Sequence, residues 1–152
     1  MQLSEHFSLA ELTKSNAGDK AGLKNVPHEH DLENLKRLCA VMLEPLRTKL
    51  GQPITVFSGF RGPEINKLVG GSKTSDHMIG CAADIIVHGM TPLELCKAID
   101  SAGLPYKQII HEFGQWCHVS IPAAEGIAPK REKLTAKKVN GKTVYERGLV
   151  AV

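Results

Sequence analysis

The chain has 152 residues, of which 42% are apolar and 23% charged, and its formal net charge is +3. These values are ordinary for one soluble domain that buries its own core, and no apolar segment approaches the roughly 20 residues of a membrane-spanning helix. The basic C-terminal stretch has one aromatic residue, Tyr145, and no nucleic-acid-binding motif. We therefore expect one domain over residues 1–152, without membrane insertion and without a nucleic-acid partner.

The N-terminal segment MQLSEHFSLAEL lacks the basic start and the apolar run of a secretory signal. We expect synthesis in the cytoplasm without an export signal of its own. The four cysteines have no CxxC spacing, which favours buried thiols over a cysteine-based zinc site. They are Cys39, Cys81, Cys96 and Cys117.

Helices are predicted in the N-terminal third. Ser8 and Glu11 have the spacing of a capping box, which predicts a short helix after Ser8. Residues 16–30 are rich in Gly, Asn and Pro and are predicted to form a loop.

The clearest helical pattern covers residues 31–50. Asp31 is expected to cap this helix and Gly51 to end it, with a kink or a restart at Pro45. The apolar residues at helical spacing are Leu32, Leu35, Leu38, Met42 and Leu46.

Short strands dominate the rest of the chain. We predict strands at 53–57 and 82–87, helices at 63–69 and 92–102, and two hairpins, one joining 108–113 to 116–121 and one joining 134–139 to 142–147. Helices followed by strands that are joined mainly by hairpins predict an α+β fold with a largely antiparallel sheet.

The segment SDHMIGCAAD carries the strongest chemical signal. It places His77 and Asp84 seven residues apart, and Asp84 begins an apolar run, where a buried carboxylate needs a partner. His118, in the segment WCHVS, is the candidate for a third ligand. Two imidazoles and one carboxylate, with one position left open, are the ligands of hydrolytic zinc sites. Either histidine considered alone is more simply an ordinary structural or surface residue.

Four segments in this order resemble a known family: SGFR (58–61), Asn66 with VGGS (69–72), SDHMIGCAAD (75–84) and WCHVS (116–120). The set is similar to the zinc peptidases that include D-Ala-D-Ala carboxypeptidases, dipeptidases and phage endopeptidases that cut peptidoglycan stem peptides. HFSLAELTKS, LEPLR and GLPY…HEFGQWCHVS resemble its small phage-type, endolysin-like branch. The resemblance runs from about residue 5 to 147 and implies a hedgehog/DD-peptidase-like fold, with N-terminal helices packed on the sheet.

The resemblance also implies roles for individual residues. His77, Asp84 and His118 would be the ligands of Zn²⁺. Arg61 would bind a substrate carboxylate or stabilise the developing oxyanion, a role that suits a fixed guanidinium. Ser75 would form a hydrogen bond near the metal or the substrate, and Gln115 is expected to contact the substrate.

The general base is the point at which this chain departs from the family pattern. Many members have Glu or Asp three residues before the last zinc histidine, where this chain has Gln115, and an amide cannot take a proton from water. Glu112 is the nearest carboxylate. A two-residue turn would place His111, not Glu112, beside His118, whereas a bulge or a longer turn would favour Glu112. Glu112 as the base and His111 as a proton relay both stay open.

These expectations together describe a monomeric, zinc-dependent peptidase that cleaves peptidoglycan stem peptides or cross-links. The sequence leaves open whether it is a carboxypeptidase or an endopeptidase. It would reach the wall after phage-mediated release or as a virion component. The alternative is a non-catalytic zinc-binding phage structural or wall-binding protein, which Gln115 favours.

Overall fold

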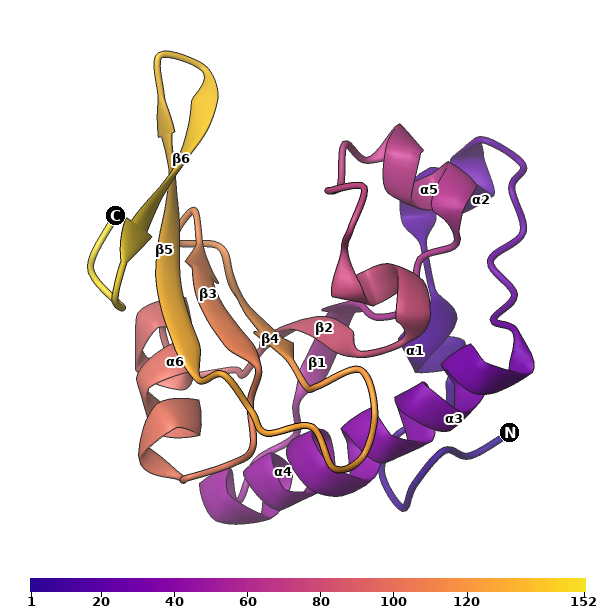
Figure 1. Ribbon diagram of the computed structural model, residues 1–152, viewed down its shortest axis with the longest axis horizontal. Helices are drawn as coiled ribbons and strands as arrows, with labels where there is room; N and C mark the ends of the chain where they lie inside the picture. The colour runs from indigo at the N-terminus through magenta and orange to yellow at the C-terminus, as the bar shows by residue number, and fades with distance from the viewer.

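The computed structural model describes all of residues 1–152 and is built around a six-stranded sheet (Figure 1). The strands are β1 (Thr55–Ser58), β2 (Ala82–Ile86), β3 (Gln108–Glu112), β4 (Trp116–Ser120), β5 (Glu132–Val139) and β6 (Lys142–Arg147). Their order in the sheet is β1-β2-β4-β3-β5-β6, and every pair is antiparallel except the parallel pair of β3 and β5. The prediction of an α+β fold with a largely antiparallel sheet is confirmed.

The helical elements are α1 (Leu9–Thr13), α2 (Asn16–Lys20), α3 (Glu29–Leu38), the π-helical turn η1 (Cys39–Leu43), α4 (Glu44–Leu50), α5 (Pro63–Leu68), the 3-10 turn η2 (Asp76–Ile79) and α6 (Pro92–Ser101). The capping box of Ser8 and Glu11 is present at the start of α1, as predicted. No helix is both long and apolar enough to span a bilayer.

The prediction of a loop throughout residues 16–30 was wrong, because α2 lies within it. The Ser15 hydroxyl accepts a hydrogen bond from the Gly18 backbone N–H at 3.1 Å and so caps this short helix. A Cβ at Gly18 would collide with Ile65 of α5, so the missing side chain lets the two helices approach closely.

The long helical segment begins two residues earlier than the sequence suggested. His28, not Asp31, is the residue before the first helical position, and the Asp31 carboxylate accepts a hydrogen bond from the His28 backbone N–H at 3.0 Å. The π-helical turn η1 ends at Leu43, two residues before Pro45, and α4 begins at Glu44 with that proline in its first turn. A proline has no N–H for the preceding turn, and a local π turn is one way for a helix to accommodate it.

The hydrophobic core lies between one face of the sheet and the helices α3, α4 and α6. Leu35, Leu46 and Ile99 contribute from the helices, and Ile85 and Val119 from the sheet. The four cysteines are buried and unpaired, as predicted. Since side chains alternate along a strand, the neighbours of the core residues in β2, β3 and β4 point to the opposite face.

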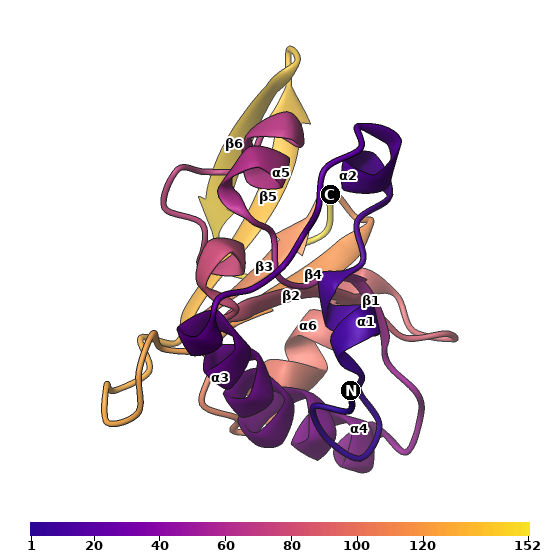
Figure 2. The ribbon, with the colours of Figure 1, turned by 90° about the vertical axis from the view of Figure 1, so that its right-hand side faces the viewer.

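This opposite face of the sheet is the floor of a cleft. The β5–β6 hairpin stands at one side of it, and α5 with the segment that follows it stands at the other (Figure 1). In the view turned by 90°, α5 lies in front of the hairpin, so the two elements face each other (Figure 2).

Candidate metal centre and cleft

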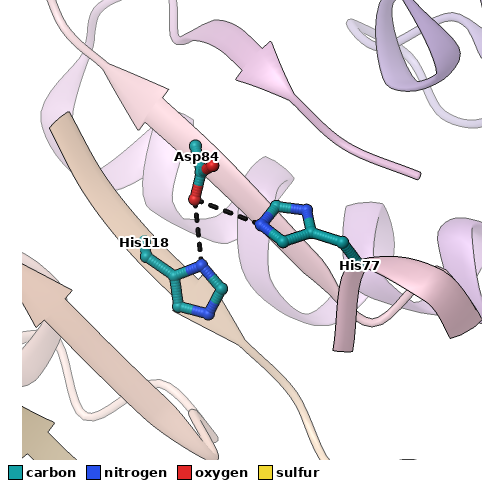
Figure 3. Close-up of side chains that lie close together, drawn as sticks. All are labelled: His77, Asp84 and His118. Atoms are coloured by element: carbon teal, nitrogen blue, oxygen red, sulfur yellow. Dashed lines mark hydrogen bonds and ion pairs between the residues drawn. The ribbon is translucent and has the colours of Figure 1, made fainter. Parts of the chain in front are cut away.

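Three elements bring His77, Asp84 and His118 together (Figure 3). Asp84 of β2 and His118 of β4 are directly opposite in the strand register, and His77 projects toward them from η2. Asp84 Oδ1 lies 2.9 Å from His118 Nδ1 and 3.3 Å from His77 Nε2. All three side chains are buried, and one potential ligand atom from each lies within 4.8 Å of the others.

The turn that carries His77 is held by local structure. The Ser75 hydroxyl accepts a hydrogen bond from the His77 backbone N–H at 3.2 Å and caps η2. Gly80 ends the turn with φ of 77°, and a Cβ there would collide with the carbonyl oxygen of Asp31 in α3. Only glycine combines this backbone conformation with so close an approach.

A hydrogen bond to the ring nitrogen that does not contact Asp84 fixes the orientation of the His77 ring. His77 Nδ1 lies 2.6 Å from the Gly59 carbonyl oxygen. Since a carbonyl oxygen only accepts hydrogen bonds, Nδ1 carries the proton and Nε2 has its lone pair free toward Asp84. A backbone carbonyl behind a histidine is a common support for a metal ligand.

The donor set fits a divalent metal ion. Tetrahedral zinc with bonds of about 2.0–2.2 Å separates its ligand atoms by about 3.3 Å, close to the two distances at Asp84. Two nitrogens and one carboxylate oxygen suit zinc. The cavity beside the three side chains leaves room for a further ligand.

The same cluster has strongly shifted pKa values. Burial opposes ionisation of Asp84, but the charges and hydrogen bonds of His77 and His118 hold its pKa well below the usual range. Burial opposes protonation of His118, yet its hydrogen bond and ion pair with Asp84 raise its pKa above the usual value. Without a metal the pair therefore favours a carboxylate beside an imidazolium, and a divalent cation would take the place of that proton.

Glu112 lies next to this cluster because the β3–β4 turn is longer than predicted. The turn has three residues, 113–115, in which Phe113 and Gly114 have positive φ values of 58° and 69°. Ile110 is therefore the residue opposite His118, and Glu112, two positions on, points to the same face. Glu112 Oε1 lies 3.6 Å from His118 Nδ1.

The environment of Glu112 suits a proton acceptor. Burial raises its pKa above the usual range, although the nearby charge of His118 opposes the shift. The Trp116 indole N–H donates a hydrogen bond to Glu112 Oε1 at 3.2 Å and holds the carboxylate in place. A carboxylate whose pKa is moved toward neutrality is better matched to taking and returning a proton.

His111 lies on the other face of the sheet, so the expectation based on a two-residue turn was wrong. The longer turn pairs His111 with Cys117 of the core. Its Nδ1 is 2.8 Å from the Val150 carbonyl oxygen, in the C-terminal segment. A proton relay from His111 to the cluster would have to pass through the sheet.

Arg61, Ser75 and Gln115 differ in their relation to the cleft. Arg61 and Ser75 line the same cavity of about 650 Å³ as the His77, Asp84 and His118 cluster. Arg61 Nε is buried without a hydrogen-bond partner, and burial lowers the pKa of its guanidinium, although Asp84 and Glu112 oppose the shift. Gln115 is exposed on the β3–β4 turn and does not line the cavity, which leaves its predicted contact with a substrate without support.

Two supporting groups were not predicted from the sequence. The Gly59 carbonyl that contacts His77 Nδ1 lies in the segment SGFR. The only hint in the sequence that this segment lies at the site was its place in the family pattern. Trp116 lies two residues before His118, and its role depends on the turn length, which was misjudged. The cleft wall formed by Lys138, Thr143 and Tyr145 was also missed, since the sequence showed only a basic hairpin.

A family model described as Peptidase M15 matches residues 5–120, well over half of the chain. The matched segment contains Arg61, Glu112 and the three clustered residues and ends with β4. No curated protein matches the chain.

Proposed function

The chain belongs to the peptidase M15 family of metallopeptidases, and we propose that it is a zinc-dependent peptidase that hydrolyses the peptide part of bacterial peptidoglycan. The observation that carries the proposal is the convergence of His77, Asp84 and His118 beside a cleft that also contains Glu112. A buried cluster of this kind is not explained by the stability of the sheet, because the cost of removing its charges from water offsets the attraction between them.

The residues of the cleft have distinct parts in this reaction. When bound, zinc supplies Lewis-acid chemistry, since it acidifies a water molecule and polarises the scissile carbonyl group. Glu112 takes the proton of the attacking water and returns it to the leaving amine, held for this purpose by Trp116. Arg61 stabilises the negative oxygen that develops, or holds a substrate carboxylate, with a guanidinium whose buried Nε has no hydrogen-bond partner.

Peptidoglycan is proposed as the substrate because the ordered segments of this chain resemble enzymes that act on it. The resemblance to the small phage-type branch further supports action on the wall after phage-mediated release or from a virion. Both exopeptidase and endopeptidase cleavage are compatible with this proposal. The position of Glu112 favours a catalytic protein over the alternative of a non-catalytic zinc-binding wall protein.

The test is incubation of the zinc-loaded protein with purified peptidoglycan. New amino groups are labelled, and mass spectrometry of the released fragments identifies the bond that is cut. The proposal predicts new amino groups with the wild-type protein and very few with the Glu112→Gln variant. A zinc-loaded, folded wild-type protein that releases none from walls of several peptide types would support the non-catalytic alternative.

A further inference from the structure

The β5–β6 hairpin forms part of the cleft although it lies outside the segment that the family model matches. The match ends at residue 120, and the hairpin covers Glu132–Val139 and Lys142–Arg147. Lys138, Thr143 and Tyr145 of this hairpin line the same cavity as His118. Figure 1 shows the hairpin rising opposite α5. Any ligand that fills the cleft therefore contacts side chains of this hairpin.

Of the two neighbouring lysines of the hairpin, one is paired with an acidic residue and the other is not. Lys137 forms an ion pair with Glu146 at 2.6 Å. Lys138 points to the other face, toward the cleft, and forms no ion pair. A cation that faces a cavity without an acidic partner is available to an anionic ligand.

Two contacts hold the Lys138 ammonium in the cleft wall. Its Nζ donates a hydrogen bond to the Thr143 hydroxyl at 3.0 Å and lies 5.4 Å from the centre of the Phe113 ring. The cross-strand register places Lys138 directly opposite Thr143. These contacts reduce the side-chain freedom that would otherwise be lost when a ligand binds.

This wall of the cleft also has hydrogen-bond donors that are not used within the protein. Since the Thr143 oxygen accepts from Lys138, the Thr143 hydroxyl hydrogen is free to point to an acceptor. Lys138 has two further N–H groups, and Tyr145, two residues from Thr143 and on the same face of β6, also lines the cavity. An ammonium and two hydroxyls together suit a carboxylate.

We propose that Lys138, Thr143 and Tyr145 form a carboxylate subsite that binds a free carboxylate of the peptide substrate. This inference rests on the proposed peptidase function. Arg61 follows β1 and Lys138 lies on β5, with the strands of Asp84 and His118 between them in the sheet. The two cations therefore flank the reacting centre, and the substrate carboxylate at Lys138 lies on the side of the scissile bond away from Arg61.

The test measures binding separately from cleavage. Zinc-loaded protein with Glu112→Gln serves as the background, because it holds peptides without turning them over. One set of probes consists of stem pentapeptides whose glutamate has a free carboxylate or a carboxamide. A second set consists of terminally blocked alanine pentapeptides with Glu or Gln at each position in turn. Dissociation constants are compared for the background, for added Lys138→Met and for the matched control Lys137→Met.

The carboxylate form of at least one pair should bind about tenfold or more tightly than its amide partner. Lys138→Met should reduce this preference to less than twofold while the affinity for the amide form stays unchanged, and Lys137→Met should preserve it. A preference that survives Lys138→Met overturns the subsite, as does the lack of any preference in both sets. Cleavage of peptidoglycan by wild-type protein without such a preference overturns only the subsite. A Lys138-dependent preference without cleavage overturns only the proposed function.

Discussion

Asp84 and His118 are a directly opposed pair on the antiparallel strands β2 and β4, with Oδ1 and Nδ1 2.9 Å apart. The register of the sheet therefore fixes the distance between two of the three potential metal ligands. A slip of one residue would turn His118 toward the core and Cys117 toward the cleft. The metal centre thus depends on the same strand pairing that buries Ile85 and Val119.

Replacing Glu112 with Gln should lower kcat/KM by about 10²- to 10⁴-fold, because the amide cannot accept the proton of the attacking water. Bound zinc should be retained, since the variant keeps His77, Asp84 and His118. Peptidase assays and metal analysis of the same preparation measure both effects. Glu146→Gln is the control for loss of a carboxylate on the hairpin surface and should leave kcat/KM within twofold. Near-normal turnover by Glu112→Gln would remove Glu112 from the mechanism.

Trp116→Phe should lower kcat by about tenfold, since it removes the N–H that positions Glu112. That hydrogen bond favours the charged carboxylate and lowers the pKa of Glu112, so its loss should move the acid limb of the pH–rate profile to higher pH. Phe57→Leu is the packing control, because the Phe57 ring contacts Trp116 but offers no donor. An unshifted acid limb would show that Trp116 does not act through Glu112.

At pH values below the raised pKa of His118, zinc binding should release a proton. In the metal-free protein the Asp84 carboxylate keeps His118 protonated to higher pH than usual, and a metal needs the neutral imidazole. Zinc affinity should therefore rise with pH, by up to about tenfold per unit, and level off above that pKa. Calorimetry at pH 6.5 in buffers of different ionisation enthalpy should show about one proton released. His88→Gln, an exposed control, should not change this number, and binding without proton release would contradict the assignment.

Gly80→Ala should destabilise the protein by about 2 kcal/mol or more, because it combines backbone strain with a collision at the Asp31 carbonyl. Gly89→Ala is the matched control, with φ of 88° and nothing within 4 Å of its Cβ, and should lose only about 1 kcal/mol. Urea denaturation measures both values. Gly80→Ala should also weaken zinc binding, since Gly80 ends the turn that holds His77. Equal losses of unfolding free energy for the two variants would mean that η2 and α3 can move apart at little energetic cost.

Local patterns in the sequence predicted much of the fold. The capping box at Ser8 marked the start of α1, and the helices predicted at 63–69 and 92–102 begin in the structure at Pro63 and Pro92, as predicted. These signals act over three or four residues, so a single sequence reveals them. Helix α2 was not predicted, because the cap residue Ser15 precedes a segment rich in Gly, Asn and Pro and because the helix also depends on the contact with Ile65 of α5.

The candidate site was predictable in its ligands but not in its base. The spacing of His77 and Asp84 and the segment around His118 were visible in the sequence, and the structure brings these side chains together. The choice between His111 and Glu112 depended on one residue of turn length. The positive φ of Phe113, uncommon for a residue with a side chain, created the longer turn and could not be read from the pair Gly114-Gln115.

The zinc content of protein purified without chelators tests the central claim most directly. Wild-type protein should contain one zinc ion per chain, and Asp84→Ala and Asp84→Asn, checked for folding by circular dichroism, should contain almost none and lack peptidase activity. Full zinc occupancy in a folded Asp84 variant would contradict the proposed metal centre.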